Sequence, residues 1–223
     1  MSVDGGPKIV TDGLVMCLDA TNPKSYPGSG VVWNDLSGNG TDATLLNNIP
    51  HSSQYFVLDG EGDGAIINDF PAIFSNSVTM SGWFYFDTDN TRDILFGSYD
   101  GPSNVNFERS SSNGLRIYWN YGENSIYSDA GIAPAVEWMH IAMCRNKEEG
   151  KFQFYVNGTL ESNPNVTSSD INTTGMTFRI GRDVRTDSTN MNGKISTINI
   201  YSKALLPAEV KQNYNALKGR FGL

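Results

Sequence analysis

The sequence predicts an all-β fold, a sandwich or barrel of antiparallel strands with one short helix at the C-terminus. Short runs in which apolar and polar residues alternate recur along the 223-residue chain, separated by clusters of Gly, Asn, Asp and Ser. This pattern is typical of proteins built from many short antiparallel strands. Apolar spacing of the helical kind appears only near the C-terminus. The length suits one domain, since all-β sandwiches often reach about 250 residues as a single unit.

Many segments carry the period-two pattern of strands. They are residues 14–18, 55–58, 65–67, 78–86, 94–98, 105–109, 115–121, 125–128, 138–145, 152–156, 177–180 and 195–201. The segment 78–86 is largely apolar at both sets of alternating positions. This predicts a central strand that is covered on both sides.

One predicted hairpin also shows which side chains face the core. Phe152, Phe154 and Val156 alternate with more polar residues, so these three should point inward. The strand at 138–145 precedes them, and the polar connection 146–151 ends near a glycine. Such a connection is typical of an antiparallel hairpin.

The last segment of the chain changes to helical spacing. Pro207 suits the first turn of a helix, and Val210, Tyr214 and Leu217 follow at positions i, i+4 and i+7. Gly219 could provide the left-handed residue that ends the helix. We expect this helix to pack on the sandwich through its apolar stripe.

The longest connections between these elements are predicted loops. They are residues 22–31, 38–53, 87–92, 157–175 and 182–192. Loops of this length often carry function in a compact domain.

Charge and composition exclude several classes of partner. The chain has 16 basic and 24 acidic residues, a net charge of −8, and no basic cluster that could neutralise a row of phosphates. We therefore expect no nucleic acid partner. No apolar run is long enough for membrane insertion, and the first residues do not read as a secretory signal. Cys17 and Cys144, each among alternating apolar residues, are expected to be reduced core thiols.

Several motifs carry a family resemblance. They are Trp-Asn-Asp-Leu-Ser-Gly-Asn-Gly at 33–40, Leu-Asp-Gly at 58–60, Glu-Trp-Met-His-Ile-Ala at 137–142, Phe-Tyr-Val-Asn-Gly at 154–158, Met-Asn-Gly-Lys-Ile at 191–195 and Ile-Tyr-Ser-Lys-Ala-Leu at 200–205. In this order they resemble the laminin G-like branch of the concanavalin A-like lectin/glucanase jelly rolls. The resemblance implies a two-sheet antiparallel jelly-roll sandwich over residues 12–223. Residues 1–11, which contain two glycines and a proline, are expected to form a mobile N-terminal arm.

Segments near both ends of the domain resemble a narrower group within this family. Residues 13–20, 22–30 and 213–223 look like laminin G-like domains of tailed-phage structural proteins. This likeness implies a virion component, with other capsid or tail proteins as partners. Reduced cysteines agree with assembly inside a cytoplasm.

A calcium site is one hypothesis for the loop after residue 58. Asp59 and Asp63 place carboxylates among glycines that allow the backbone to bend, which suits a hard cation such as calcium. The alternative is a structural turn whose carboxylates accept backbone hydrogen bonds. The resemblance implies an acidic residue after the Gly-x-Ile step in members that bind calcium, whereas this chain has Ser196.

Aromatic and amide side chains near residue 120 form the best candidate for carbohydrate binding. Leu115 and Ile117 side with Trp119 by alternation, so Tyr118 and Asn120 are expected to point outward. An exposed aromatic ring and a polar group are what a sugar-binding surface needs.

Catalysis has little support in the sequence. A retaining glycosidase needs two carboxylates about 5 to 5.5 Å apart, and the related jelly rolls supply them through a Glu-x-Asp-x-x-Glu pattern. Glu61 and Asp63 match its first two positions, but Ile66 occupies the third. We therefore expect a non-enzymatic virion surface protein, a decoration or tail-associated domain that binds host-surface carbohydrate or neighbouring virion proteins. Alternatives are a secreted or cell-surface carbohydrate-binding module and, less favoured, a glycan hydrolase.

Overall fold

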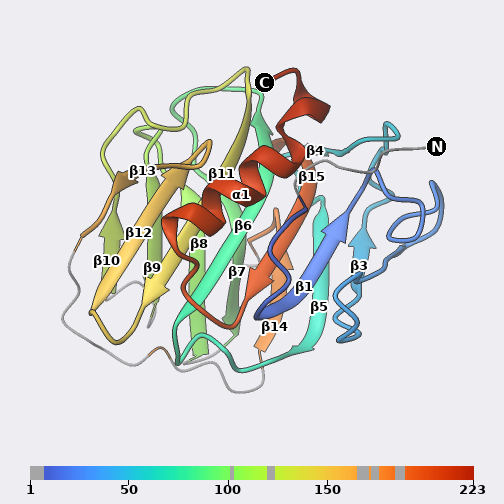
Figure 1. Ribbon diagram of the computed structural model, residues 1–223. Helices are drawn as coiled ribbons and strands as arrows, with labels where there is room; N and C mark the ends of the chain where they lie inside the picture. Colours follow the sequence, from blue (N-terminus) through green and yellow to red (C-terminus); the bar gives the residue numbers. More distant parts are fainter. Residues whose placement is uncertain (1–7, 101–102, 120–123, 165–170, 172–175, 184–188) are drawn as a thin grey trace.

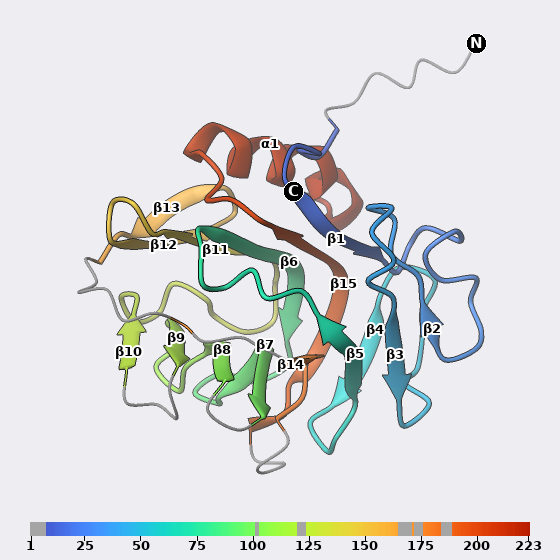
Figure 2. The same ribbon diagram turned by 90° about the horizontal axis from the view of Figure 1, so that it is seen from below.

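The computed structural model describes residues 8–100, 103–119, 124–164, 171, 176–183 and 189–223. Two antiparallel sheets pack face to face, and one short helix lies outside them (Figures 1 and 2). The predicted two-sheet antiparallel jelly-roll sandwich is therefore confirmed. No helix in these described ranges is long and apolar enough to cross a membrane.

One sheet carries the helix on its outer face and lies nearer the viewer in Figure 1; it is called the back sheet below. Its order is β1 (Leu14–Asp19), β15 (Asn192–Tyr201), β6 (Val78–Phe86), β11 (Trp138–Asn146), β12 (Lys151–Val156) and β13 (Thr159–Ser162), and β4 (Phe56–Asp59) pairs with β15 beside this path. The strand β6 is central and almost wholly buried, as its two apolar faces predict. The hairpin β11–β12 is also confirmed.

The other sheet, the front sheet, has eight strands. Its order is β10 (Asn124–Tyr127), β9 (Leu115–Trp119), β8 (Ser103–Arg109), β7 (Asp93–Asp100), β14 (Met176–Ile180), β5 (Gly64–Phe70), β3 (Ala43–Leu46) and β2 (Val32–Trp33). The strands β2, β3 and β13 were not expected from the sequence. Each has four residues or fewer, too few for alternation to distinguish a strand from a loop.

Large apolar side chains fill the space between the sheets. Phe152, Phe154 and Val156 all belong to this core, together with residues of β6, which confirms their predicted register. The Phe154 ring stacks on Phe107 of the front sheet, with ring centroids 6.1 Å apart. Burial of such rings is the main favourable term that holds the two layers together.

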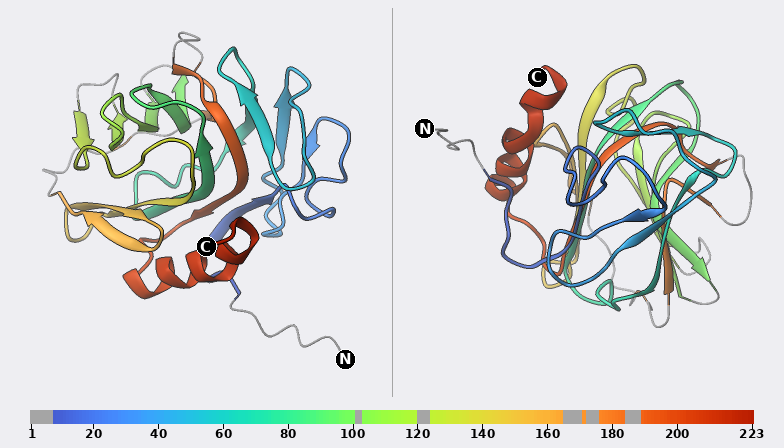
Figure 3. Two further views of the ribbon diagram at one scale, coloured as in Figure 1. Left: turned by 90° about the horizontal axis from the view of Figure 1, so that it is seen from above. Right: turned by 90° about the vertical axis from the view of Figure 1, so that its right-hand side faces the viewer.

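The C-terminal helix α1 (Pro207–Leu217) lies across the outer face of the back sheet (Figure 3). Val210 is fully buried there, as its place in the predicted stripe requires. The helix does not end at a left-handed Gly219: a 3-10 helix η3 (Lys218–Phe221) continues the chain, and Gly222 takes the left-handed conformation with φ 76°. The prediction for Gly219 was wrong because the extra turn moves the end of the helical segment.

Residues 8–11 of the expected N-terminal arm lie against α1 and β15, and the mobility of the arm stays a prediction. Val10 is buried, and its backbone N–H donates to Asn213 Oδ1 at 2.8 Å. Its carbonyl accepts from the Tyr201 hydroxyl at 3.1 Å. Residues 1–7 lie outside the described ranges. Cys17 and Cys144 are both buried and free, as predicted.

Candidate functional site

The outer face of the front sheet carries the polar cluster that best suits binding. Along β9, Leu115, Ile117 and Trp119 are buried in the core, as alternation predicts. Arg116 and Tyr118 therefore point to the opposite face of the sheet.

Arg116 is held in place by an ion-pair network on that face. Its Nη1 donates to Glu108 Oε1 at 3.2 Å, and its Nη2 donates to Ser125 Oγ at 2.8 Å. Arg92 binds the same carboxylate through two hydrogen bonds of 3.2 and 2.7 Å. Because Glu108 is fully buried, the two guanidinium groups offset its charge and satisfy both of its oxygens.

Two tyrosine rings flank the Arg116 guanidinium. Its Cζ atom lies 4.4 Å from the ring centroid of Tyr118 and 5.1 Å from that of Tyr127, within the range of cation–π contacts. Arg92, Glu108, Arg116, Tyr118 and Tyr127 are called the Arg116 cluster below. They come from β8, β9, β10 and the turn before β7, which strand pairing brings together.

The predicted exposure of Tyr118 was wrong. Tyr118 does lie on the outer face, but only 2% of its surface is exposed, because the ring is packed beside Arg116. Asn120 falls outside the described residues, so its expected role stays a prediction. Tyr127, by contrast, is 54% exposed. It pairs with Arg116 across the β9–β10 hairpin.

Tyr127 was not predicted as a site residue, because alternation within β9 alone gives no information on it. Tyr127 belongs to a separate predicted strand, 125–128, and its face depends on the register of the hairpin. That register is not readable from either strand by itself. The same holds for Glu108, which lies opposite Arg116 on β8.

The Asp59 and Asp63 loop is a tight turn between β4 and β5. Asp59 Oδ1 accepts the backbone N–H of Glu61 at 2.8 Å. Asp63 is buried, and burial, followed by the negative charge of Asp59, raises the pKa of its carboxyl above the usual range. The two predicted metal residues are therefore close enough to interact.

The Arg182 guanidinium already binds part of this loop. Arg182 Nη1 donates to the Gly62 carbonyl at 2.9 Å, and its charge partly offsets that of the Asp63 carboxylate. The Gly62 carbonyl, an oxygen that calcium could use, also accepts from Asn47 at 3.0 Å. These contacts favour the structural turn. Within the described ranges no group of three or more His, Cys, Asp or Glu side chains could hold a metal ion, and calcium binding stays a prediction.

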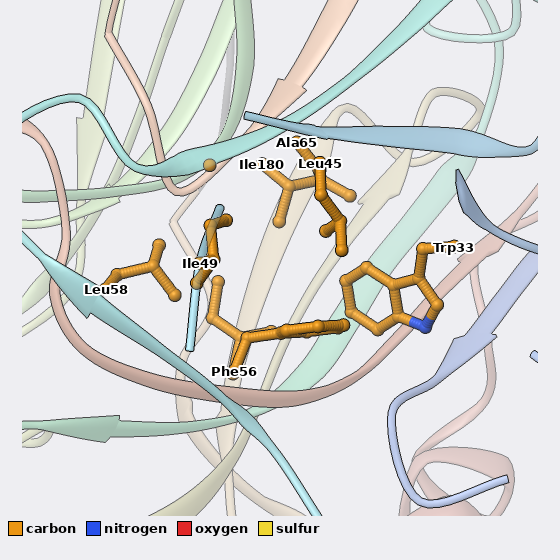
Figure 4. A pocket seen from close by; sticks show the side chains of 9 residues that line it. Trp33, Leu45, Ile49, Phe56, Leu58, Ala65 and Ile180 are labelled. Carbon is orange, nitrogen blue, oxygen red and sulfur yellow. The ribbon is translucent and has the colours of Figure 1, made fainter. Parts of the chain in front are cut away.

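The interior of the sandwich offers no ligand site in the cavity shown in Figure 4. Its volume is about 10 Å³, and its lining is apolar, with the Trp33, Phe56 and Leu45 side chains around it. A space of that size holds at most one water molecule, and an apolar lining gives such a water no partners.

Comparison with known proteins decides the family. A laminin G model, described as the concanavalin A-like lectin/glucanases superfamily, matches residues 59–211. The chain belongs to this superfamily. No curated protein matches the sequence.

Several solved structures have a similar fold. Trypanosoma rangeli sialidase in complex with sialic acid matches with a TM-score of 0.68 and 14% identity, over 94% of this chain and 33% of the sialidase chain. The botulinum neurotoxin serotype D binding domain matches with a TM-score of 0.72 and 18% identity, over 92% of this chain and 52% of the other. A second structure, of the receptor binding domain of botulinum neurotoxin D, gives a TM-score of 0.71 at 18% identity, over 94% of this chain and 53% of the other. This chain thus spans about a third to a half of their length, and identities this low show a shared fold alone.

Proposed function

We propose that this chain is a non-enzymatic carbohydrate-binding domain and that the Arg116 cluster is its glycan-contact surface. The exposed ring of Tyr127 beside a fixed guanidinium carries the proposal. A sugar can stack its C–H face on an exposed aromatic ring, while guanidinium N–H groups donate to its oxygens. Both features are present on one face of the front sheet.

Rigidity of the cluster supports binding. Arg116 makes an ion pair, a hydrogen bond to Ser125 and two ring contacts, so little side-chain entropy is left to lose when a ligand arrives. Arg92 is 37% exposed at its side chain and offers a second cationic group at the edge. The cluster is thus pre-organised on the sheet rather than on a loop.

One of the similar structures is named with a sugar ligand, and two are named as binding domains. One is a sialidase in complex with sialic acid, and others are a binding domain and a receptor binding domain of botulinum neurotoxin. They share the fold with this chain at low identity. Glycan recognition by this chain is therefore our proposal and is not inherited from them.

Hydrolysis is the less favoured alternative. In the described part of the cluster Glu108 is the one carboxylate, and two arginines bind it. Most glycosidases need a second carboxylate about 5 to 9.5 Å away. We therefore propose binding without turnover.

We further propose that the domain acts on a virion surface, as a decoration or tail-associated protein that contacts host-surface glycan or neighbouring virion proteins. The motifs at both ends of the chain support this placement. A secreted or cell-surface carbohydrate-binding module is the alternative. Labelling of intact phage particles by an antibody against this chain supports the virion proposal, and particles that lack the chain contradict it.

A glycan array tests the binding proposal. The domain is applied with calcium and with a chelator, beside the Tyr127→Ala variant at equal concentration. Selective binding that the variant loses supports the proposal. Binding that is absent, or equal in the variant, contradicts it.

A further inference from the structure

A pocket of about 410 Å³ opens on the far side of the molecule from the Arg116 cluster. It lies between the back sheet, the end of α1 with η3, and the docked N-terminal segment. The residues that matter for its chemistry are Lys8, Cys17, Asp19, Thr197, Asn199 and Arg220. Small-molecule sites in proteins commonly have volumes of about 300 to 1,000 Å³.

The floor of this pocket is formed by side chains of two paired strands, β1 and β15. Thr197 of β15 lies opposite Asp19 of β1, and Asn199 lies opposite Cys17. Because each position is two residues from the next along its strand, all four side chains share one face of the back sheet. That is the outer face, where η3 covers the neighbouring Trp83 through the Phe221 ring, whose centroid lies 4.2 Å away.

Two polar atoms in this floor are buried without a partner. Thr197 is 1% exposed and Asn199 is 3% exposed. In the described residues Thr197 Oγ1 and Asn199 Oδ1 find no hydrogen-bond partner. Leaving such atoms unsatisfied costs about 1 to 3 kcal/mol each, and native proteins rarely accept that cost. Both residues line the pocket, so a polar molecule bound there lies beside the two side chains that lack a partner.

The mouth of the pocket carries net positive charge. Arg220 Nη1 donates to both oxygens of Asp19, at 2.9 and 2.8 Å, which offsets that carboxylate. Among the described residues, Arg220 Nε and Nη2 make no hydrogen bond, and Lys8 adds a second, exposed cation. A ligand with an anionic group at this end would therefore be attracted and hydrogen-bonded.

We propose that this pocket binds a small hydroxylated carboxylate, with its hydroxyl groups on Thr197 and Asn199 and its carboxylate at Arg220 and Lys8. A hydroxyl donates to the amide oxygen of Asn199 and exchanges a hydrogen bond with Thr197. Arg220 receives the carboxylate through its remaining N–H donors. The site lies on the opposite sheet from the Arg116 cluster, so the two proposals stand or fall separately.

The test uses D-glucuronate as the probe and D-glucose as its neutral counterpart. Binding is followed by calorimetry and by backbone amide NMR shifts of the whole domain. Thr197→Val removes the hydroxyl at constant shape, and Arg220→Gln removes the cation at the mouth. Lys24→Gln is the matched control, since it also removes one exposed positive charge but does not line the pocket.

We expect saturable binding of D-glucuronate with shifts confined to the pocket walls, which are β1, β15, the end of α1 with η3, and residues 8–11. Thr197→Val and Arg220→Gln should each weaken it about tenfold, Lys24→Gln should not, and D-glucose should bind about tenfold more weakly than D-glucuronate. Thermal unfolding of each variant confirms that it is folded. No saturable shifts at these elements would overturn the proposal, because ordered water alone then satisfies Thr197 and Asn199. Equal affinity of the wild type and Arg220→Gln would also overturn it.

Discussion

The guanidinium of Arg109 lies inside the sandwich, with its Nη2 atom 2.8 Å from Asp93 Oδ2. Both side chains are almost completely buried. The Arg109 group also lies over the Phe86 ring of the back sheet, 4.2 Å from its centroid, and donates to Thr91 and to the Thr88 carbonyl. One residue of the front sheet therefore anchors the connection between β6 and β7.

Removal of this arginine should strongly destabilise the fold. Arg109→Leu leaves the Asp93 carboxylate buried without its partner, a loss of about 3 to 5 kcal/mol in the free energy of unfolding. The double variant Arg109→Leu, Asp93→Leu should recover part of that loss, because no lone charge remains. Urea unfolding measures both. A single variant as stable as the wild type would show that the pair does not hold the loop.

His140 should make stability depend on pH. Burial lowers the pKa of His140 from 6.5 to about 3, so the unfolded chain takes up a proton between these values while the folded chain does not. Stability is therefore fully present above pH 6.5 and falls as the pH drops towards 3, by at most about 1.4 kcal/mol for each pH unit.

The His140→Phe variant should flatten this part of the profile. His51→Gln is the control, since it changes the other histidine and leaves His140 in place. Chemical unfolding at a series of pH values between 3 and 8 gives the slopes. Identical slopes for His140→Phe and the wild type would mean that carboxylates alone cause the acid sensitivity.

Asp35 is the centre of the Trp-Asn-Asp-Leu-Ser-Gly motif. Its carboxylate accepts hydrogen bonds from the Cys17 N–H at 2.8 Å, from the Ser37 hydroxyl at 2.6 Å and from the Thr41 hydroxyl at 2.9 Å. Burial opposes ionisation, but the hydrogen bonds from Ser37, Cys17 and Thr41 outweigh it, and the pKa of Asp35 is lowered. This contribution is present above the ordinary carboxyl pKa and is lost as the pH falls through the folded value.

Asp35→Ala should therefore lower the free energy of unfolding by about 1 to 3 kcal/mol at neutral pH. The loss should be smaller in acid, where the wild type also loses the contribution of the Asp35 carboxylate. Asp42→Ala, a change in the same connection, should cost less, because among the described residues the Asp42 side chain accepts a single hydrogen bond, from the Asp35 N–H. Thermal unfolding at pH 7 and pH 3 compares the two. Equal costs for both variants would contradict a special role for Asp35.

Calcium binding at the Asp59 and Asp63 loop has a simple thermodynamic readout. A cation that binds the folded state raises the free energy of unfolding by about 2.7 kcal/mol at 100 times its dissociation constant. If the site exists, calcium raises the melting temperature, and Asp63→Asn abolishes the rise. If neither calcium nor a chelator moves the melting temperature, the loop is a structural turn held by Arg182.

The sequence was sufficient for the fold where the hydrophobic pattern is strong. Alternation in β12 predicted both the strand and its buried face, and the apolar run of β6 predicted a central strand covered on both sides. It was insufficient for the short edge strand β2 and for the docking of Val10. These depend on hydrogen bonds to distant residues, such as the one from the Val10 N–H to Asn213.

The candidate site was also predicted only in part. Alternation correctly placed Tyr118 on the outer face, but exposure depends on what packs there. Arg116 lies on β9 with Tyr118, but its partner Glu108 lies on β8 and Tyr127 lies on β10, and only the register of these three strands brings them together. A pattern within a single strand contains no information on that register.

The most direct test of glycan binding at the Arg116 cluster is a titration of the best array glycan into the domain and its Tyr127→Ala variant. Leu160→Ala, which removes an exposed apolar side chain on the back sheet, serves as the control. Loss of the stacking ring should weaken binding about tenfold, equivalent to about 1.4 kcal/mol, while the control binds like the wild type. An unchanged dissociation constant for Tyr127→Ala would contradict the account.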